Sequence, residues 1–384
     1  MKTSNVCTPT NGNDGTIYVA LELSRRTWLV TMHSPDRDRI SRHKVDGDDH
    51  AGLLKLIAKI RERATRKLGL EPVVVSCYEA GYDGFWLHRL LTAAGITNHV
   101  FDPASITVEQ RARRAKTDRI DGERLLRTLR DYCRGELRVV RIVRVPSREQ
   151  EDVRRDTREQ DRLTTEQGAH TNRIKALLRL QGMAVGDPRQ RDWLNWLAKQ
   201  RDWEGNPVPP RLLEEIRREH ARLMVVIEQL AALAQKQTAP AQLSPAAAEM
   251  ARRRDLLFQL KSLGPAFSRK LVNEAFYKDF RNRREVGGYF GLDGSPWRSG
   301  QTNREQGISK AGNHRARHAA VELAWLWLLH QPDSALSKWF RQRTANASKR
   351  IRRITIVALA RKLMVALWRF LTAGLIPEGA VFKA

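Results

Sequence analysis

The sequence has few cysteines, few aromatic residues and no long uncharged apolar segment, and each shortage excludes a class of protein. Its three cysteines, Cys7, Cys77 and Cys133, form no CxxC pair, which argues against a disulfide scaffold or a cysteine zinc site. No apolar run of about 18 residues is free of charge and no lipidation signal occurs, so no membrane partner is expected. Aromatic residues make up only 7% and show no stacking pattern, which argues against single-strand recognition on an aromatic sheet.

The remaining composition is strongly basic. Lysine and arginine number 69 against 43 acidic residues, which gives a net charge of +26 at neutral pH. Such a charge repels itself unless a polyanion neutralises it, while 41% hydrophobic residues are enough to build a core. Residues 1–15 are polar and lack the apolar segment of a signal peptide, so we expect a disordered leader on a reduced, cytoplasmic protein. The sequence predicts a folded protein that binds nucleic acid.

Residues 16–145 show the pattern of a mixed α/β domain. The first of three stretches alternates along the strand, and two further stretches follow it as candidate strands. Tight turns between them predict an antiparallel meander. Strands then alternate with helices. The expected strands are residues 16–24, 27–34, 39–45, 72–79 and 96–102, and the expected helices are 49–68, 85–95 and 118–132.

The rest of the chain is predicted to be helical. Residues 146–181 are dense in Arg, Glu and Gln with sparse apolar positions, which is typical of long polar helices, and residues 211–237 show a second long helical pattern. We therefore predict a helical, coiled-coil linker over residues 146–255. A hinge is expected near residues 238–250. Residues 256–375 form a third, mainly α unit around one irregular loop, and residues 376–384 form a tail.

Four carboxylates are candidates for a metal site. Glu22 ends the first strand on the face opposite its aliphatic residues, and Glu79 ends the buried strand VVVSCYE. Asp118 and Asp121 lie three apart, so a helix places them on one face. Oxygen ligands select hard cations, which makes Mg²⁺ or Mn²⁺ the expected cofactor for phosphodiester chemistry. The alternative is that each acid is a surface residue paired with one of the many bases.

The loop 291–315 offers a candidate nucleophile. Ser299 follows Arg298, and cations near a serine hydroxyl stabilise the charge that develops on an attacked phosphate. Spacing alone makes Ser295 and Ser309 equally eligible, and a simple polar turn is the alternative. His314 and His318 are four residues apart but have no evident third ligand, so we interpret them as surface or phosphate-facing residues.

Basic stretches recur in every predicted unit. They occur at Arg111–Arg119, Arg281–Glu285 and Arg341–Arg353, and we expect them to contact phosphates. A short segment, KSLGPAFSRKLV, is similar to half of a helix-hairpin-helix, whose turn offers backbone N–H groups to phosphate. The candidate nucleic-acid-binding residues are Arg111, Arg113, Arg114, Lys116, Arg298, Arg304, Lys310 and Arg315.

Taken in order, these motifs resemble those of the insertion-sequence-110 family of transposases. The chain has ALELS, CYEAGYDG, AKTDRIDGERLL, SLGPAFSRKL, YFGLDGSPWRSG, GISKAGNHRARHAAVELAW and ALARKLMVALW. AKTDRIDGERLL and GISKAGNHRARHAA are the most specific pieces. The resemblance covers about residues 16–375.

The resemblance implies a fold, a chemistry and partners. It implies a RuvC-like, RNase H-like domain, a coiled-coil middle and a C-terminal transposase domain in a bacterial, nucleoid-associated protein. Glu22, Glu79, Asp118 and Asp121 would form the acidic tetrad, and Ser299 would form a covalent link to DNA. The family also implies double-stranded DNA, a guide RNA and a homo-oligomer, dimer or tetramer, whose protomers share active sites.

One departure and two rival functions accompany this resemblance. The first acid of the family is Asp, whereas this chain has Glu22, and misplacement on an ångström scale can cost about 10²-fold in rate. One rival is a RuvC-like nuclease that uses water and needs no Ser299. The other is a catalytically inactive nucleic-acid-binding relic. A DEDD exonuclease fits less well, because ALELS has one acid where that class has an Asp-x-Glu pair.

Overall fold

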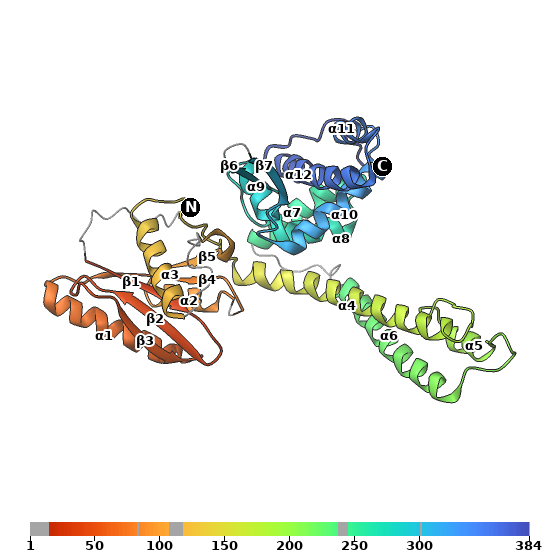
Figure 1. Cartoon of the computed structure of the whole chain (residues 1–384), viewed down its shortest axis with the longest axis horizontal. Helices are drawn as coiled ribbons and strands as arrows, with labels where there is room; N and C mark the ends of the chain where they lie inside the picture. The colour runs from red at the N-terminus through yellow and green to blue at the C-terminus, as the bar shows by residue number, and fades with distance from the viewer. Residues whose placement is uncertain (1–14, 83, 107–117, 237–244, 300–301, 384) are drawn as a thin grey trace. The chain divides into compact units, whose positions relative to one another are not determined.

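The structure is a computed structural model that describes residues 15–82, 84–106, 118–236, 245–299 and 302–383 (Figure 1). Within these ranges the side chains of residues 118–119, 236, 296–299 and 302–305 are not described. The chain divides into two compact units, residues 1–145 and 146–384. None of the helices in the described ranges combines the length and the apolar composition that crossing a bilayer requires.

The first unit is a mixed α/β domain, as the sequence predicts. Its strands and helices follow the predicted order and lie within a few residues of the predicted bounds. The elements are β1 (Thr16–Glu22), β2 (Thr27–His33), β3 (Ser41–Asp46), α1 (His50–Leu68), β4 (Val73–Glu79), α2 (Trp86–Ala93), β5 (Thr97–Phe101), a 3₁₀ turn (Pro103–Ser105) and α3 (Asp118–Cys133).

These strands form one five-stranded sheet in the order β3-β2-β1-β4-β5. The first three strands pair antiparallel, which confirms the predicted meander, whereas β4 pairs parallel to both β1 and β5. Both faces of the sheet are covered, because alternate residues of β1 enter two separate cores. Ile17, Val19 and Leu21 pack with α1 and α2, whereas Ala20 packs with α3.

The second unit is mainly helical. Its elements are α4 (Arg148–Arg179), α5 (Trp193–Ala198), α6 (Pro210–Lys236), α7 (Pro245–Gln259), α8 (Pro265–Leu271), a π-helical turn (Val272–Phe276), α9 (Arg283–Phe290), β6 (Gly294–Ser299), β7 (Thr302–Ile308), α10 (His314–His330), α11 (Ala335–Thr344) and α12 (Lys349–Ala373).

Two apolar cores hold this unit together. The far half of α4 packs along α6 and α5 through Ile174, Leu178 and Leu223, and Figure 1 shows α4 and α6 as a long helical pair. Coiled-coil geometry for this pair stays a prediction. The larger core joins α7 to α12 and centres on buried residues such as Phe290 and Trp327.

One expectation for the second unit is wrong, and another is tested only in part. The loop that was expected to be irregular contains a β-hairpin, in which β6 pairs antiparallel with β7. Its strands are mostly Pro, Gly, Ser and charged or amide residues, so their sequence has little of the β-branched and apolar content that marks a strand. The expected hinge at 238–250 is helical from Pro245 onward, where α7 begins, and residues 237–244 lie outside the described residues.

Candidate active site

Two of the four candidate acids meet at the carboxyl edge of the parallel strands. In the β1–β4 ladder Leu21 lies opposite Tyr78, so the next residues, Glu22 and Glu79, end neighbouring strands at the same level. Alternation along each strand places both carboxylates on the face that α3 covers, because Ala20 and Cys77 of that face pack with α3. Both residues are half-buried.

Helix α3 carries the other two acids and approaches the same edge. A Cβ added to Gly122 would lie 2.4 Å from Thr31 Oγ1 and 3.6 Å from Leu29 Cδ2, so only glycine allows this close approach to β2. Leu29 is the register partner of Glu22 on β1. Gly122, the residue directly after Asp121, therefore lies close to Leu29, the β2 neighbour of Glu22.

Of the two aspartates of α3, the structure describes the side chain of Asp121 but not that of Asp118. Asp118 is the first residue of α3, and its side chain lies outside the described part of the chain. The Asp121 carboxylate is 15% exposed and accepts a 2.8 Å hydrogen bond from Arg124 one turn later. One turn further along α3, the carbonyl oxygen of Leu125 accepts a hydrogen bond from the buried Cys77 thiol at 3.8 Å, which joins α3 to β4.

The donor chemistry of this edge fits a hard cation. All four candidate ligands are carboxylates, the class that Mg²⁺ and Mn²⁺ prefer. In the part of the chain whose side chains are described, however, no group of three or more His, Cys, Asp or Glu residues is placed to share an ion. Glu22 and Glu79 are adjacent, while Asp121 faces Arg124. The structure thus brings two acids together and places the helix of the others against them.

The structure places Ser299 at the end of β6, next to the tip of the hairpin. Its register partner across the two-residue connection is Thr302. Ser295 lies further down the same strand, and Ser309 follows β7 at the base, where its N–H donates to the carbonyl of Asp293 at 2.8 Å. Of the three serines, Ser299 alone is next to the hairpin tip.

The predicted nucleic-acid contacts have mixed outcomes. Arg111, Arg113, Arg114 and Lys116 lie outside the described residues, as do the side chains of Arg298 and Arg304. Lys310 is exposed and adopts a left-handed backbone with φ of 56°.

Arg315 and the two histidines lie on α10. Arg315 Nη1 lies 3.6 Å from Asp161 Oδ2 of α4, so this guanidinium has a partner within the protein. His314 and His318 are exposed, and His318 Nδ1 lies 3.2 Å from Glu322 Oε2.

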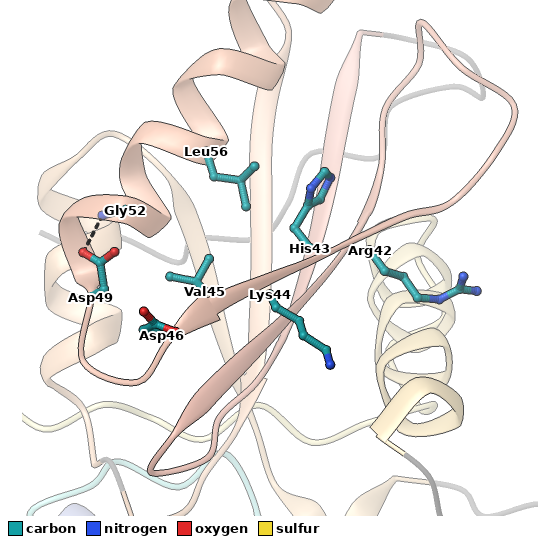
Figure 2. Close-up of a pocket in the computed structure, with 8 residues that line it drawn as sticks. All are labelled: Arg42, His43, Lys44, Val45, Asp46, Asp49, Gly52 and Leu56. Atoms are coloured by element: carbon teal, nitrogen blue, oxygen red, sulfur yellow. Dashed lines mark hydrogen bonds between the residues drawn. The ribbon is translucent and has the colours of Figure 1, made fainter.

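A polar pocket in the first unit is separate from the acid edge. It has a volume of about 570 Å³ and lies between β3 and the start of α1, where Figure 2 shows Asp49 capping the Gly52 amide. Its lining residues are Arg42, His43, Lys44, Val45, Asp46, Asp49, Gly52 and Leu56. Glu22, Glu79 and Asp121, the candidate acids whose side chains are described, do not line it, and β2 separates β3 from β1.

Sequence reasoning missed one buried cluster in the second unit. Glu274, in the π-helical turn, is hydrogen-bonded to Arg154 and Arg158 of α4 and to Asn313 at the start of α10. The AGN of GISKAGNHRARHAA was a signal for a tight turn and a helix cap, but nothing in the sequence pairs Asn313 with a residue 39 positions earlier.

Comparison with known proteins agrees with the motifs. A family model for the DEDD domain of IS110 elements, described as "Transposase", matches residues 23–182 and so begins one residue after Glu22. A second, "Transposase IS116/IS110/IS902 family", matches residues 254–338.

Two relatives extend the likeness over nearly the whole chain. "Putative transposase y4rJ" of Sinorhizobium fredii is 46% identical over 376 residues, which cover 96% of this chain and 95% of that protein. "Putative transposase y4qE" of the same organism is 28% identical over 367 residues, covering 93% of this chain and 82% of that protein. The protein is a transposase. Within that class, the chain belongs to the IS110 family of insertion-sequence transposases.

Proposed function

We propose that this transposase cuts and rejoins DNA through a covalent phosphoserine at Ser299, opposite an acidic tetrad of Glu22, Glu79, Asp118 and Asp121. The observation that carries the proposal is the meeting of Glu22 and Glu79 at one strand edge, with Gly122 of α3 against the neighbouring strand position. The sheet order and the covering helix α3 support an RNase H-like fold for this unit.

The chemistry would be two transesterifications. The Ser299 hydroxyl oxygen forms a bond to the phosphorus, the bond from phosphorus to the leaving deoxyribose oxygen breaks, and that oxygen takes up a proton. A hydroxyl of the second DNA strand then attacks the phosphoserine, the bond to Oγ breaks, and Ser299 regains its proton. Each step exchanges one phosphodiester bond for another, so no external energy source is needed.

The acids and bases of the chain would divide the remaining work. Glu22, Glu79, Asp118 and Asp121 would hold Mg²⁺ or Mn²⁺, which supplies Lewis-acid stabilisation of charge on the phosphate. Lys310 and the neighbouring arginines would hold the DNA backbone. Membership of the family also supports a guide RNA encoded beside the gene and an oligomer in which Ser299 of one protomer serves the acids of another.

Trapping the covalent adduct tests this proposal. The native chain, Ser299→Ala and the matched control Ser295→Ala would be incubated with Mg²⁺, labelled DNA and RNA from the regions flanking the gene, then separated under denaturing conditions. We expect adduct from the native chain and from Ser295→Ala, and none from Ser299→Ala.

Each other result has a defined meaning. Adduct that persists in Ser299→Ala contradicts the assignment of the nucleophile. Nicked DNA without any adduct supports a nuclease that uses water. Binding without cleavage, by both the native chain and Glu22→Asp, supports an inactive relic.

A further inference from the structure

Glu274 is an acid buried almost completely inside the second unit. Its side chain is 1% exposed, and Arg154 and Arg158 donate to it at 3.1 Å and 2.9 Å. Burial by itself raises the pKa of Glu274, but the hydrogen bond from Arg158 and the charge of Arg154 hold it below its usual value. A buried ionic cluster stabilises a fold poorly compared with apolar residues, and its best-attested use is to fix one arrangement.

The cluster fastens the beginning of α4. Arg154 also lies over the Tyr277 ring at 4.9 Å, and Asn273 donates to Thr157 Oγ1 at 2.7 Å. Lys270 donates to Asp161 at 2.9 Å. Positions 154, 157, 158 and 161 follow the spacing of one helix face, so α4 contacts the π-helical turn and α8 through a polar stripe.

Asn313 links this cluster to α10. Its Oδ1 accepts from the N–H groups of Arg315 and Ala316, which caps α10. Its Nδ2 donates to Glu274 Oε2 and to the Glu274 carbonyl, both at 2.9 Å. One amide side chain therefore performs two separable tasks, a helix cap and a bond to the buried acid.

The same residues close the base of the β6–β7 hairpin. The N–H of Asn313 donates to Tyr289 O at 2.8 Å, and the Tyr289 hydroxyl donates to Glu274 O at 2.8 Å. Gly312 has φ of 80°, and an added Cβ would lie 2.3 Å from Tyr289 O, so this crossing is tight. Tyr289 lies five residues before β6 and Asn313 five residues after β7, so both ends of the hairpin meet at Glu274.

We propose that Glu274 and Asn313 are positioning residues for strand transfer, because they fix the base of the hairpin that carries Ser299 to the first turns of α4. The proposal rests on the proposed function of Ser299. A π-helical turn, as found at Glu274, occurs often at functional sites. Neither residue touches DNA in this proposal, and both act through the backbone of the hairpin.

Asn313→Asp separates the two tasks, and the chain offers a matched control. Aspartate caps a helix as well as asparagine does, but it faces Glu274 with a carboxylate in place of the donor. Asn282 caps α9 through Arg284 and Glu285, and its described contacts include no acid partner for its Nδ2. We expect Asn313→Asp to slow adduct formation at saturating DNA about 10²-fold with unchanged DNA affinity, and Asn282→Asp to stay within about twofold.

A double variant tests the pairing and guards against a folding defect. Glu274→Gln combined with Asn313→Asp restores a donor facing a carboxylate, so we expect a rate at least about ten times that of Asn313→Asp alone. Adduct formation by Asn313→Asp within about threefold of the native rate would overturn the proposal. The proposal would also be overturned if the rate of the double variant fell by the product of the two single-variant fold-losses, because the two residues would then act independently.

Amide exchange separates this proposal from that of the nucleophile. Asn313→Asp should speed hydrogen exchange in residues 302–308, whereas Asn282→Asp should not. Faster exchange in Asn313→Asp, with no adduct even from the native chain, would show that Asn313 fixes the base of the hairpin, but it would reject Ser299 as nucleophile and with it the role in strand transfer. Unchanged exchange would reject the positioning role whatever Ser299 does.

Discussion

His99 shows how one buried side chain makes the first unit sensitive to acid. It lies in β5 with 4% exposure, its ring meets Tyr132 edge-on at 5.3 Å, and its Nε2 has no partner among the described residues. Burial, and then the charge of His88, lowers the pKa of His99 to about 4. The folded protein therefore holds this ring neutral at pH values where the unfolded chain protonates it.

The sign of the pH dependence follows from this lowered pKa. Because the unfolded chain binds the extra proton, stability from His99 is complete above pH 6.5 and is lost as the pH falls toward 4. The loss is on the order of 3 kcal/mol. We expect urea unfolding at pH 7 and pH 4.5 to show a smaller difference for His99→Phe than for the native chain.

Other histidines set the limits of this test. Burial also lowers the pKa values of His33 and His43, so His99→Phe should remove only part of the pH dependence. His330→Gln, at an exposed position, is the control and should keep the native difference. An equal pH difference in His99→Phe and the native chain would show that His99 does not contribute.

At the residue scale, the acids of the sheet were predictable and Glu274 was not. Alternation within β1 and the apolar run of β4 place Glu22 and Glu79 at strand ends, and parallel neighbours end at one edge. Glu274 lies in VNEAF, which has the composition of an ordinary amphipathic helix. Its π-helical geometry and its partners from α4 and α10 depend on packing between distant segments.

At the scale of an element, Gly122 determines how closely α3 lies on the sheet. Thr31, its neighbour on β2, is fully buried and β-branched, so it has little freedom to move away from a new methyl group. We expect Gly122→Ala to destabilise the first unit by about 1–3 kcal/mol and to reduce adduct formation, because α3 carries Asp118 and Asp121. Urea unfolding and the adduct assay measure the two effects.

A second substitution distinguishes this contact from a general effect of alanine. Thr31→Ala removes the Oγ1 atom that the new methyl group meets, so the double variant should regain most of the lost stability and rate. Gly168→Ala in α4 meets no atom within 4 Å and should stabilise by about 0.5–1 kcal/mol. Equal losses in the single and double variants would mean that Thr31 does not set the position of α3.

The hairpin was the element that sequence patterns missed, although one signal was present. Two residues, Gly300 and Gln301, separate β6 from β7, and a short connection with glycine is typical of hairpins. The strands themselves give no regular alternation, because the pairing shifts register between Gly294 and Pro296. Its base depends on tertiary contacts, such as the 2.8 Å ion pair between Asp293 and Arg361 of α12, which no local pattern contains.

At the scale of the whole molecule, the positive charge is unevenly distributed. Residues 334–377 contain no Asp or Glu, and α12 has no acid in its first turn. Cations near a helix N-terminus oppose the helix dipole, so this arrangement costs stability unless an anion is bound. Five exposed cations lie around the start of α12, and we call them the α12 basic cluster: Arg343, Lys349, Arg350, Arg352 and Arg353.

Salt dependence measures whether the α12 basic cluster contacts DNA. Each phosphate neutralised on duplex DNA contributes about 0.9 to the slope of log K against log salt. Changing all five residues to Gln should make that slope less steep, by up to about 4.5. Arg162, Arg189 and Arg252, each ion-paired with an acid, serve as the control, and changing them to Gln should leave the slope nearly unchanged. Equal slopes for the cluster variant and the native chain would show that DNA binds elsewhere. A drop in the control variant that is as large per charge removed would show an effect of net charge and not of contact.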